Sequence, residues 1–342
     1  MFPAESVDKP LPDIEFRMPS KILVTGGAGY IGAHVCKALS ESGCTPVVYD
    51  NLCRGHEESV KWGPLEIGDI TDDDRLLEVI KRHKPEGVMH FAALAYVGES
   101  VENPGEYYRT NVRGMISLLS AMEKSSVKPI VYSSSCAIYG NAQTLPISEG
   151  HSQMPINPYG ATKVMCERIL KDFAIGDKLK WMALRYFNVA GDDPEGEIGE
   201  NHDPETHVLP NLILTALGKR ETFELYGTDL PTRDGTAIRD YIHVTDIANA
   251  HVCALQHLLG GGESGAFNLG TGHGFTIREL ILAVENVTGN KLPVTCMAGR
   301  PGDPPELVAD PSLGQETLNW QPQFSDIETI VRTAVQWHAA AI

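Results

Sequence analysis

Short apolar runs alternate with longer amphipathic stretches from residue 21 to about residue 187 of this chain. The apolar runs predict strands at 22–25, 46–50, 65–67, 87–91, 129–133 and 181–187. The stretches between them predict helices at 30–42, 72–83, 103–124 and 159–175. Apolar strands that alternate with amphipathic helices are typical of a parallel sheet covered on both faces. The pattern therefore predicts an α/β fold with a doubly wound parallel sheet.

The pattern changes after Asn188. Residues 191–205 are rich in Gly, Asp, Glu and Pro, which is typical of a long loop. Short strands and helices are predicted beyond this loop, at 208–217, 244–259, 276–287 and 327–338. We therefore expect a loose tail at 1–20, a cofactor-binding domain at 21–190 and a smaller α/β substrate-binding domain at 191–342. Segments near 235–262 are expected to return to the first domain.

The composition is that of a soluble globular protein, with 42% apolar and 21% charged residues among 342. A net charge of −17 argues against nucleic acid or an anionic membrane as a partner. The seven cysteines are scattered and form no CxxC pair, so we expect a reducing compartment, no disulfide and no metal site. The chain has no run of about 18 apolar residues, the length of a membrane-spanning helix. Its first residues lack the basic segment followed by an apolar segment that is typical of a signal peptide. We therefore expect a cytoplasmic protein.

Three glycines follow the first predicted strand. Gly26, Gly29 and Gly32 lie between the strand at 22–25 and the helix that follows it. A strand, a glycine turn and a helix in this order place a pyrophosphate on backbone N–H groups at the helix N-terminus. The spacing is GxxGxxG instead of GxGxxG, but it serves the same tight turn and close helix packing. The sequence therefore predicts a Rossmann-type dinucleotide site.

The ends of the next three strands extend this prediction. Asp50 ends the second strand, where a carboxylate would accept hydrogen bonds from the adenosine ribose and repel a 2′-phosphate. This favours NAD over NADP, and the alternative is a polar cap of the strand. Asp69-Ile70 closes the third strand, where we expect a contact with adenine. Phe91-Ala92-Ala93 closes the fourth, and its small side chains would let the chain pass close to a dinucleotide.

Tyr159 and Lys163 are four residues apart and therefore share one face of a predicted helix. An ammonium about 6 Å from the phenol would favour phenolate by roughly 3 kcal/mol, or about two pKa units. The positive charge of bound NAD+ would add to this effect, and Tyr159 could then act as a base near neutral pH. Ser133-Ser134-Ser135 ends the fifth strand, where a hydroxyl can hydrogen-bond the reacting oxygen. The alternative is a chance YxxxK pair on a solvated helix face.

Together these motifs resemble those of a known superfamily. They are TGGAGYIG (25–32), DNL (50–52), GDI (68–70), HFAA (90–93), VGES (97–100), YYRTNV (107–112), SSSCAIYG (133–140), NPYGATK (157–163), RYFNVAG (185–191), DGTAIRDYIHV (234–244) and RPGD (300–303). From residue 21 to about residue 338, the chain resembles the extended short-chain dehydrogenase/reductase superfamily, and closely its UDP-glucose 4-epimerase family.

The resemblance implies a Rossmann-type NAD-binding domain, a domain that binds a UDP-sugar, and a homodimer. It implies that Tyr159 is the base, Ser135 its hydroxyl partner and Lys163 the residue that tunes it. NAD would be held by Gly26, Gly29, Tyr30, Ile31, Gly32, Asp50, Asn51, Asp69, Ile70, Phe91, Ala92, Ala93, Asn111, Ser133, Tyr159, Lys163 and Phe187. The UDP-sugar would be held by Ser135, Tyr159, Asn188, His207, Val208, Arg239, Arg300, Asp303 and Leu307.

The reaction implied by the resemblance is the interconversion of UDP-glucose and UDP-galactose, a step of galactose metabolism. A hydride passes from C4 of the sugar to NAD+ while Tyr159 takes the proton of the 4-hydroxyl. The 4-keto sugar then turns over in the pocket and receives the hydride on its other face. The cofactor is regenerated in each cycle, so no external redox partner is needed.

Three positions depart from the family pattern. Ala95 stands where members often have a lysine that contacts the cofactor. His207 replaces an asparagine that lines the uridine diphosphate, and its imidazole could still donate a hydrogen bond. Leu307 stands where bacterial members often have a tyrosine that closes the sugar pocket. The sequence therefore leaves the sugar preference open.

Four alternative functions remain. A UDP-pentose (xylose/arabinose) 4-epimerase is the nearest, because Ala95-Tyr96 and the motif at 300–303 also occur in that type. A nucleotide-sugar 4,6-dehydratase needs an Asp-Glu pair where this chain has Cys136-Ala137 after Ser135. An oxidoreductase that uses free NAD and a dinucleotide-sensing regulator are the other two. A regulator would need a broken catalytic set, whereas Tyr159, Lys163 and Ser135 are all present.

Overall fold

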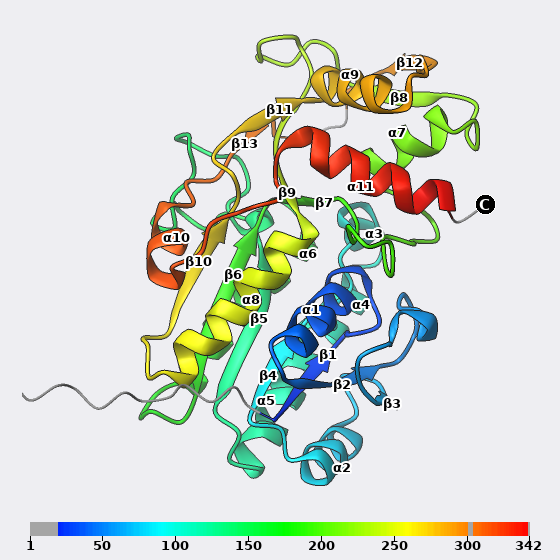
Figure 1. The fold of residues 1–342 in the computed structure, drawn as a ribbon. Helices are drawn as coiled ribbons and strands as arrows, with labels where there is room; N and C mark the ends of the chain where they lie inside the picture. Colours follow the sequence, from blue (N-terminus) through cyan, green and yellow to red (C-terminus); the bar gives the residue numbers. More distant parts are fainter. Residues whose placement is uncertain (1–19, 300–303, 341–342) are drawn as a thin grey trace, which may run out of the picture.

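A seven-stranded parallel sheet forms the centre of the molecule (Figure 1). The structure, a computed structural model, describes residues 20–299 and 304–340. The strand order is β10 (Gly265–Leu269), β6 (Lys180–Tyr186), β5 (Pro129–Ser135), β4 (Gly87–His90), β1 (Lys21–Thr25), β2 (Thr45–Asp50) and β3 (Leu65–Ile67). The order reverses at β1, and a sheet of this kind has its ligand crevice at the carboxyl ends of the strands beside such a point. The predicted doubly wound α/β fold is confirmed.

Helices cover both faces of this sheet. One face carries α1 (Tyr30–Glu41) and α8 (Val244–Leu259), and the other carries α2 (Asp73–His83), α5 (Gly114–Lys124) and α6 (Pro158–Phe173). Successive side chains of a strand point to opposite faces, so the apolar run of β1 serves both cores. Ile22 and Val24 pack in the cluster under α1 and α8, whereas Leu23 packs in the cluster under α2 and α5. This is why the sequence shows continuous apolar runs.

The helix predicted at 103–124 is present with a change of pitch. It runs from α4 (Pro104–Tyr107) through a π-helical turn (Tyr108–Arg113) into α5. The turn carries Asn111, which is buried. A short helix before it, α3 (Val97–Glu102), was not predicted because six residues are too few to show a period.

The later part of the chain forms a smaller lobe, drawn at the top of Figure 1. Its sheets contain β7 (Asn188–Ala190), β9 (Ile238–His243), β11 (Gly274–Thr276) and β13 (Glu306–Leu307), and the separate pair β8 (Phe223–Tyr226) and β12 (Val294–Met297). Its helices are α7 (Val208–Ala216), α9 (Ile277–Thr288) and α11 (Ile327–Ala340). A single apolar cluster joins these helices to β8 and β9.

In the described part of the chain, three elements beyond residue 190 pack with the large sheet, and one of them is a strand of it. Helix α8 packs against α1, and β10 pairs in parallel with β6 as the edge strand. The helix α10 (Ser312–Leu318) packs beside β10. Strand β10 was not predicted, since GAFNL is a short run that directly follows a glycine-rich turn.

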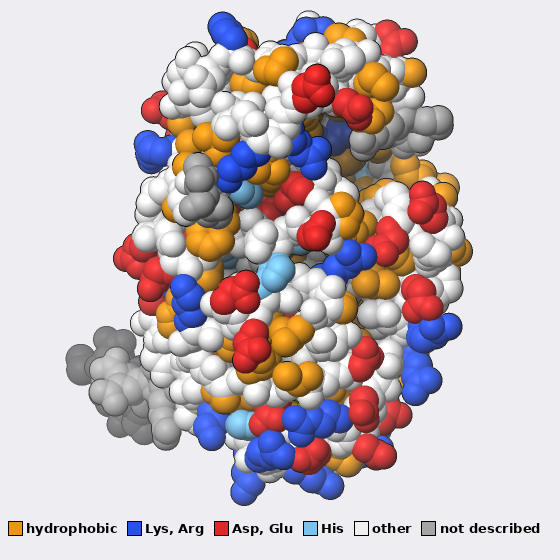
Figure 2. Space-filling model, turned by 90° about the vertical axis from the view of Figure 1, so that its right-hand side faces the viewer, with side chains coloured by type: hydrophobic (Ala, Val, Ile, Leu, Met, Phe, Trp, Pro, Cys, Tyr) orange, Lys and Arg blue, Asp and Glu red, His pale blue; other side chains and the backbone are white. Residues whose placement is uncertain are grey.

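The predicted tail at 1–20 lies outside the described residues except for Ser20. The backbone N–H and hydroxyl of Ser20 donate to the Glu86 carboxylate at 2.7 and 3.0 Å. No helix in the described part of the chain has the length and apolar character needed to cross a membrane. Figure 2 shows acidic and basic side chains interspersed over one face of the molecule.

Candidate active site

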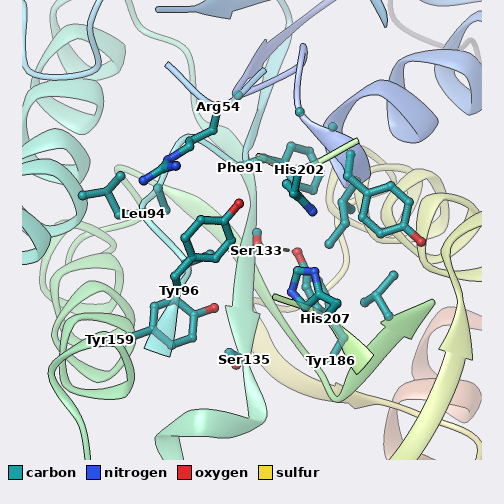
Figure 3. A pocket seen from close by; sticks show the side chains of 18 of the residues that line it. Arg54, Phe91, Leu94, Tyr96, Ser133, Ser135, Tyr159, Tyr186, His202 and His207 are labelled. Atoms are coloured by element: carbon teal, nitrogen blue, oxygen red, sulfur yellow. Dashed lines mark hydrogen bonds between the residues drawn. The ribbon is translucent and has the colours of Figure 1, made fainter. Parts of the chain in front are cut away.

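A cavity of about 270 Å³ lies at the carboxyl ends of β1, β4 and β5, between the large sheet and the smaller lobe (Figure 3). Most of the predicted site residues line it. These are Gly26, Gly29, Tyr30, Ile31, Gly32, Phe91, Ala93, Ser133, Ser135, Tyr159, Lys163, Phe187, Asn188 and His207. The structure therefore brings the glycine turn and the YxxxK pair to one cavity, although they are far apart in the sequence.

The glycine turn at residues 26–32 (the glycine cradle) is packed so tightly that it has no room for side chains at Gly26 and Gly32. Gly26 has a φ of +74°, and a Cβ there would lie 2.5 Å from the backbone nitrogen of Ala92. A Cβ at Gly32 would lie 2.2 Å from the Gly26 carbonyl oxygen. Gly29 is the N-cap of α1, and no side chain in the described residues caps it. The first N–H groups of α1 are therefore available to an anion in the cavity.

Asp50, at the end of β2, stabilises this turn by hydrogen bonds. Its carboxylate accepts hydrogen bonds from the backbone N–H groups of Ala28 at 3.0 Å and Leu52 at 2.9 Å. Burial raises the pKa of Asp50, and these two hydrogen bonds oppose that shift. Next to it, the Asn51 amide donates to Asp69 at 2.8 Å. The two carboxylates are thus fixed in position, Asp50 at the end of β2 and Asp69 in the loop that follows β3.

Nine predicted site residues in the described part of the chain do not line the cavity. Asp50, Asn51, Asp69, Ile70, Ala92, Asn111, Val208, Arg239 and Leu307 are not among the lining residues. The amide of Asn111 is bonded to both backbone groups of Leu94 at 2.8 and 3.0 Å, and to Thr162 at 3.0 Å. Asn111 therefore holds the loop after β4, which does line the cavity.

The smaller lobe carries five of the predicted sugar-binding residues: Asn188, His207, Val208, Arg239 and Leu307. Ser135 and Tyr159 lie instead on β5 and α6. Val208 begins α7 directly after His207. Arg239 on β9 pairs with Leu307 on β13, and its guanidinium donates to the Ile238 carbonyl at 2.9 Å. Leu307 packs against an apolar cluster that includes Phe187. The predicted contacts at Arg300 and Asp303 lie outside the described residues.

The start of α6 positions the YxxxK pair. The Asn157 side chain caps the helix by accepting from the N–H of Gly160 at 2.8 Å. Tyr159 therefore lies in the first turn and Lys163 one turn later, with the lysine Nζ 5.5 Å from the centre of the tyrosine ring. The Nζ donates to the Ser133 carbonyl at 2.7 Å, which orients the buried ammonium.

Burial dominates the protonation of this pair. It raises the pKa of Tyr159 to about 12, although a hydrogen bond with Ser135 acts in the opposite direction. It lowers the pKa of Lys163 to about 8. Burial therefore opposes the lowering of the Tyr159 pKa that is predicted from the charges of Lys163 and bound NAD+, because it removes the phenolate from water.

A buried ion pair supports the end of β5. The Arg185 guanidinium donates to both carboxylate oxygens of Glu167, at 2.9 and 2.6 Å, and the Ser134 hydroxyl donates to the same carboxylate at 2.7 Å. The Tyr186 hydroxyl donates to the Ser133 hydroxyl. These contacts tie β5, β6 and α6 together directly behind the catalytic candidates.

The structure adds lining residues that the sequence did not reveal. They are Arg54, Leu94, Tyr96, Glu99, Tyr186, Val189 and His202. The Arg54 guanidinium lies 4.9 Å from the centre of the Tyr96 ring and 3.0 Å from the Glu99 carboxylate. Arg54 follows β2 by a few residues, and this position near the expected crevice could have indicated a role in the site. Tyr96 and Glu99 belong to the sequence motifs given above, but the motifs did not predict a role in the site for either residue.

Known proteins resemble this chain closely. The profile of the NAD dependent epimerase/dehydratase family matches residues 22–270. The UDP-glucose 4-epimerase of Rhizobium meliloti (strain 1021) is 52% identical over 320 residues, 94% of this chain and 97% of that protein.

Two crystal structures are similar to this fold. UDP-glucose 4-epimerase from Brucella ovis in complex with NAD has a TM-score of 0.91 and 51% identity, covering 93% of this chain and 98% of that one. The enzyme from Bifidobacterium longum in complex with NAD+ and UDP has a TM-score of 0.89 and 34% identity, covering 94% of this chain and 98% of that one.

Proposed function

The chain belongs to the NAD dependent epimerase/dehydratase family, and from this we propose that it is an NAD-dependent isomerase that inverts C4 of UDP-sugars, with UDP-glucose and UDP-galactose as its hexose pair. The observation that carries the proposal is the meeting of Tyr159, Lys163 and Ser135 with the glycine turn at one cavity. Relatives named for this activity match nearly the whole chain.

The residues present fit NAD. The glycine cradle has no room for a Cβ at Gly26 and Gly32, and the uncapped start of α1 offers N–H groups to a pyrophosphate. Those predicted cofactor-binding residues that line the cavity form its wall on the side of the large sheet. We assign residues 21–190 to the NAD-binding domain, joined by α8 and β10, and most of 191–342 to the domain that binds the UDP-sugar.

In the mechanism we propose, Tyr159 takes the proton of the 4-hydroxyl and returns it after the sugar has turned over. When bound, NAD+ supplies the acceptor for the C4 hydride and a positive charge beside the phenol. Lys163, held by the Ser133 carbonyl, supplies the second positive charge that favours phenolate. Ser135 hydrogen-bonds Tyr159, and in this mechanism its hydroxyl would hydrogen-bond the same sugar oxygen.

The smaller lobe supplies the proposed UDP-sugar contacts. Asn188 and His207 line the cavity, and Val208, Arg239 and Leu307 lie on neighbouring elements. An arginine suits a diphosphate because its guanidinium donates two parallel hydrogen bonds. Arg300 and Asp303 stay proposals from the resemblance alone.

We further propose a cytoplasmic homodimer that acts in galactose metabolism. Val101, Tyr108, Ile116 and Met165 are exposed apolar side chains on the adjacent elements from α3 to α6. Such a group of apolar side chains is typical of a protein–protein interface. Light scattering coupled to size exclusion measures the mass of the assembly directly.

The proposed function predicts epimerisation without added nicotinamide. We expect purified protein that contains NAD to convert UDP-galactose to UDP-glucose with no external cofactor, because the hydride returns within each cycle. Parallel incubations with UDP-xylose and UDP-N-acetylgalactosamine separate a hexose from a pentose or N-acetylhexosamine preference. The absence of turnover with every UDP-sugar, in protein shown to hold NAD, would contradict the proposal.

The cofactor preference gives a second prediction. NADP should bind at least about tenfold more weakly than NAD, because a 2′-phosphate would face the fixed carboxylate of Asp50. Fluorescence titration of protein stripped of NAD measures both affinities. The ratio of the NADP and NAD dissociation constants should come closer to one in Asp50→Asn, which keeps the shape of the side chain but removes its charge. Equal affinities in the unsubstituted protein would show that Asp50 does not face the ribose.

A further inference from the structure

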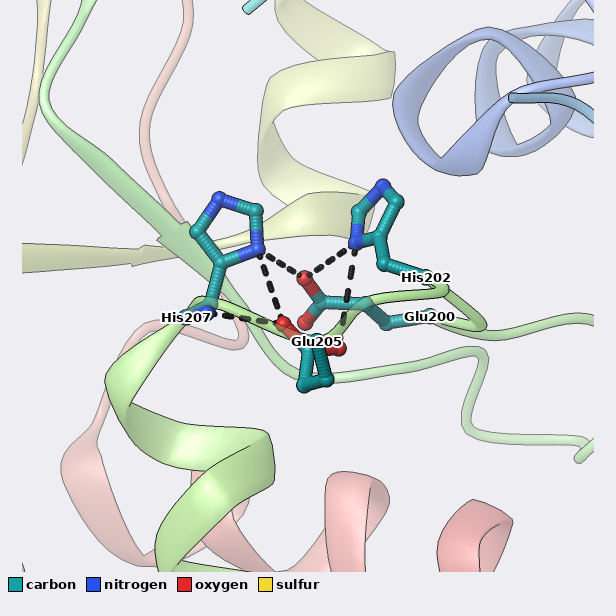
Figure 4. Close-up of side chains that lie close together, drawn as sticks. All are labelled: Glu200, His202, Glu205 and His207. Atoms are coloured by element: carbon teal, nitrogen blue, oxygen red, sulfur yellow. Dashed lines mark hydrogen bonds and ion pairs between the residues drawn. The ribbon is translucent and has the colours of Figure 1, made fainter. Parts of the chain in front are cut away.

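Two histidines and two glutamates meet in the loop between β7 and α7 (Figure 4). One donor atom from each of Glu200, His202, Glu205 and His207 lies within 4.8 Å of the other three. The His202 Nδ1 lies 3.0 Å from a Glu200 oxygen and 3.8 Å from a Glu205 oxygen. The His207 Nδ1 lies 2.6 and 3.4 Å from oxygens of the same two glutamates. Both rings thus turn their Nδ1 atoms toward one point.

The carboxylates of this cluster are buried. The side chains of Glu200 and Glu205 are 4% and 7% exposed, and the neighbouring Asp192 is 1% exposed. Within the described residues, the ion pairs of both glutamates are formed with these histidines and with no lysine or arginine. Buried carboxylates need a cation to balance them, and in proteins a bound metal ion is one solution.

The backbone around Glu200 is fixed from both sides. Its N–H donates to the Asp192 carboxylate at 2.6 Å, and its carbonyl accepts from the Trp337 indole at 3.0 Å. These contacts fix the backbone that carries the Glu200 side chain. His202 and His207 also line the cavity, so the cluster is open to an ion on that side.

We propose that Glu200, His202, Glu205 and His207 bind one divalent transition-metal ion of the Zn²⁺ type. Two imidazole nitrogens and two carboxylate oxygens form a mixed set that suits zinc in tetrahedral geometry. Magnesium and calcium prefer ligand sets made of oxygen alone. The ion would lie in the wall of the cavity, where it would face any anionic group bound there.

A second acidic group nearby provides a natural contrast. Asp193, Glu195 and Glu197 also approach one another, but the Lys37 ammonium lies among them at 2.7–2.9 Å from each. Its charge is already balanced by an amino group of the chain itself. This group therefore serves as a control and not as a second site.

The test is direct zinc binding to the full-length protein, measured by calorimetry and by metal analysis after dialysis. The exposed thiols of Cys53 and Cys296 are replaced by serine, since thiolates also bind zinc. We expect about one Zn²⁺ per chain, lost in both His202→Ala and Glu205→Gln. Glu195→Gln, in the group around Lys37, should keep the full stoichiometry.

Two results would overturn the site. One is the absence of stoichiometric zinc binding, which would leave the cluster as histidine–glutamate ion pairs. The other is binding that survives both substitutions. Glu205→Gln preserves the side-chain shape, and thermal melting of each variant shows whether it is folded. The measurement needs no sugar and no turnover, so its outcome is independent of the proposed function.

Discussion

Replacing Tyr159 with phenylalanine is expected to lower kcat by a factor of about 10² or more. The ring and its packing remain, but the oxygen that exchanges a proton with the 4-hydroxyl is lost. The Ser135 hydroxyl is a much weaker acid than a phenol, and Lys163 carries its proton below its pKa of about 8, so neither is expected to replace Tyr159 as the base. Initial rates of UDP-galactose conversion measure the effect.

Tyr226→Phe is the matched control. It removes a phenol that donates to Glu224 on β8 in the smaller lobe, outside the cavity lining. This variant should keep nearly full activity, and both variants should retain their NAD content and melting temperature. Near-normal turnover in Tyr159→Phe would mean that another group moves the proton.

Replacing Arg185 with leucine is expected to reduce the free energy of unfolding by about 3–5 kcal/mol. The guanidinium is 3% exposed and balances a Glu167 carboxylate that is 1% exposed. Its loss leaves a buried carboxylate without its cation, although Ser134 still donates to it. Urea unfolding monitored by circular dichroism measures the change.

The control for this prediction is a surface ion pair on α6, the helix that carries Glu167. Arg168 pairs with Asp172 at 2.9 Å, but their side chains are 75% and 51% exposed. Arg168→Leu should therefore change stability much less. In addition, Glu167→Leu combined with Arg185→Leu should recover part of the loss, because no charge is then left buried. Equal losses in Arg185→Leu and Arg168→Leu would contradict this view of the network.

The central sheet was predictable because its signal is local. Strands such as β1 are buried on both faces, so they show as apolar runs of four to seven residues without alternation. The π-helical turn at 108–113 was not predictable, since one wider turn leaves the helical period nearly unchanged. Strand β10 is defined by pairing with β6, a contact across about 80 residues that no short window contains.

The candidate site likewise contains residues that the sequence predicted and residues that it did not. Gly26, Gly32, Tyr159 and Lys163 were predicted from spacing within a single turn or helix, and all four line the cavity. Arg54 and His202 come from separate loops, and the chain brings them together only in three dimensions, where Arg54 reaches the carbonyl of Asp203 at 3.3 Å.

The opposing effect of burial on the pKa of Tyr159 could not be predicted from the sequence for a related reason. Spacing placed the Lys163 ammonium near the phenol, and the structure has the two together. Spacing contains no information on how far the phenol is removed from water, and that burial sets the direction of the shift.

The most direct test of the proposed chemistry follows the hydrogen at C4. UDP-glucose with deuterium at C4 is incubated with the protein in ordinary water without added nicotinamide, and the UDP-galactose formed is examined by mass spectrometry and NMR. If the hydride leaves C4 and returns to it within one cavity, the product keeps the deuterium at C4. Product that carries hydrogen at C4 in place of deuterium would contradict a reaction in which the abstracted hydride is returned to the same carbon.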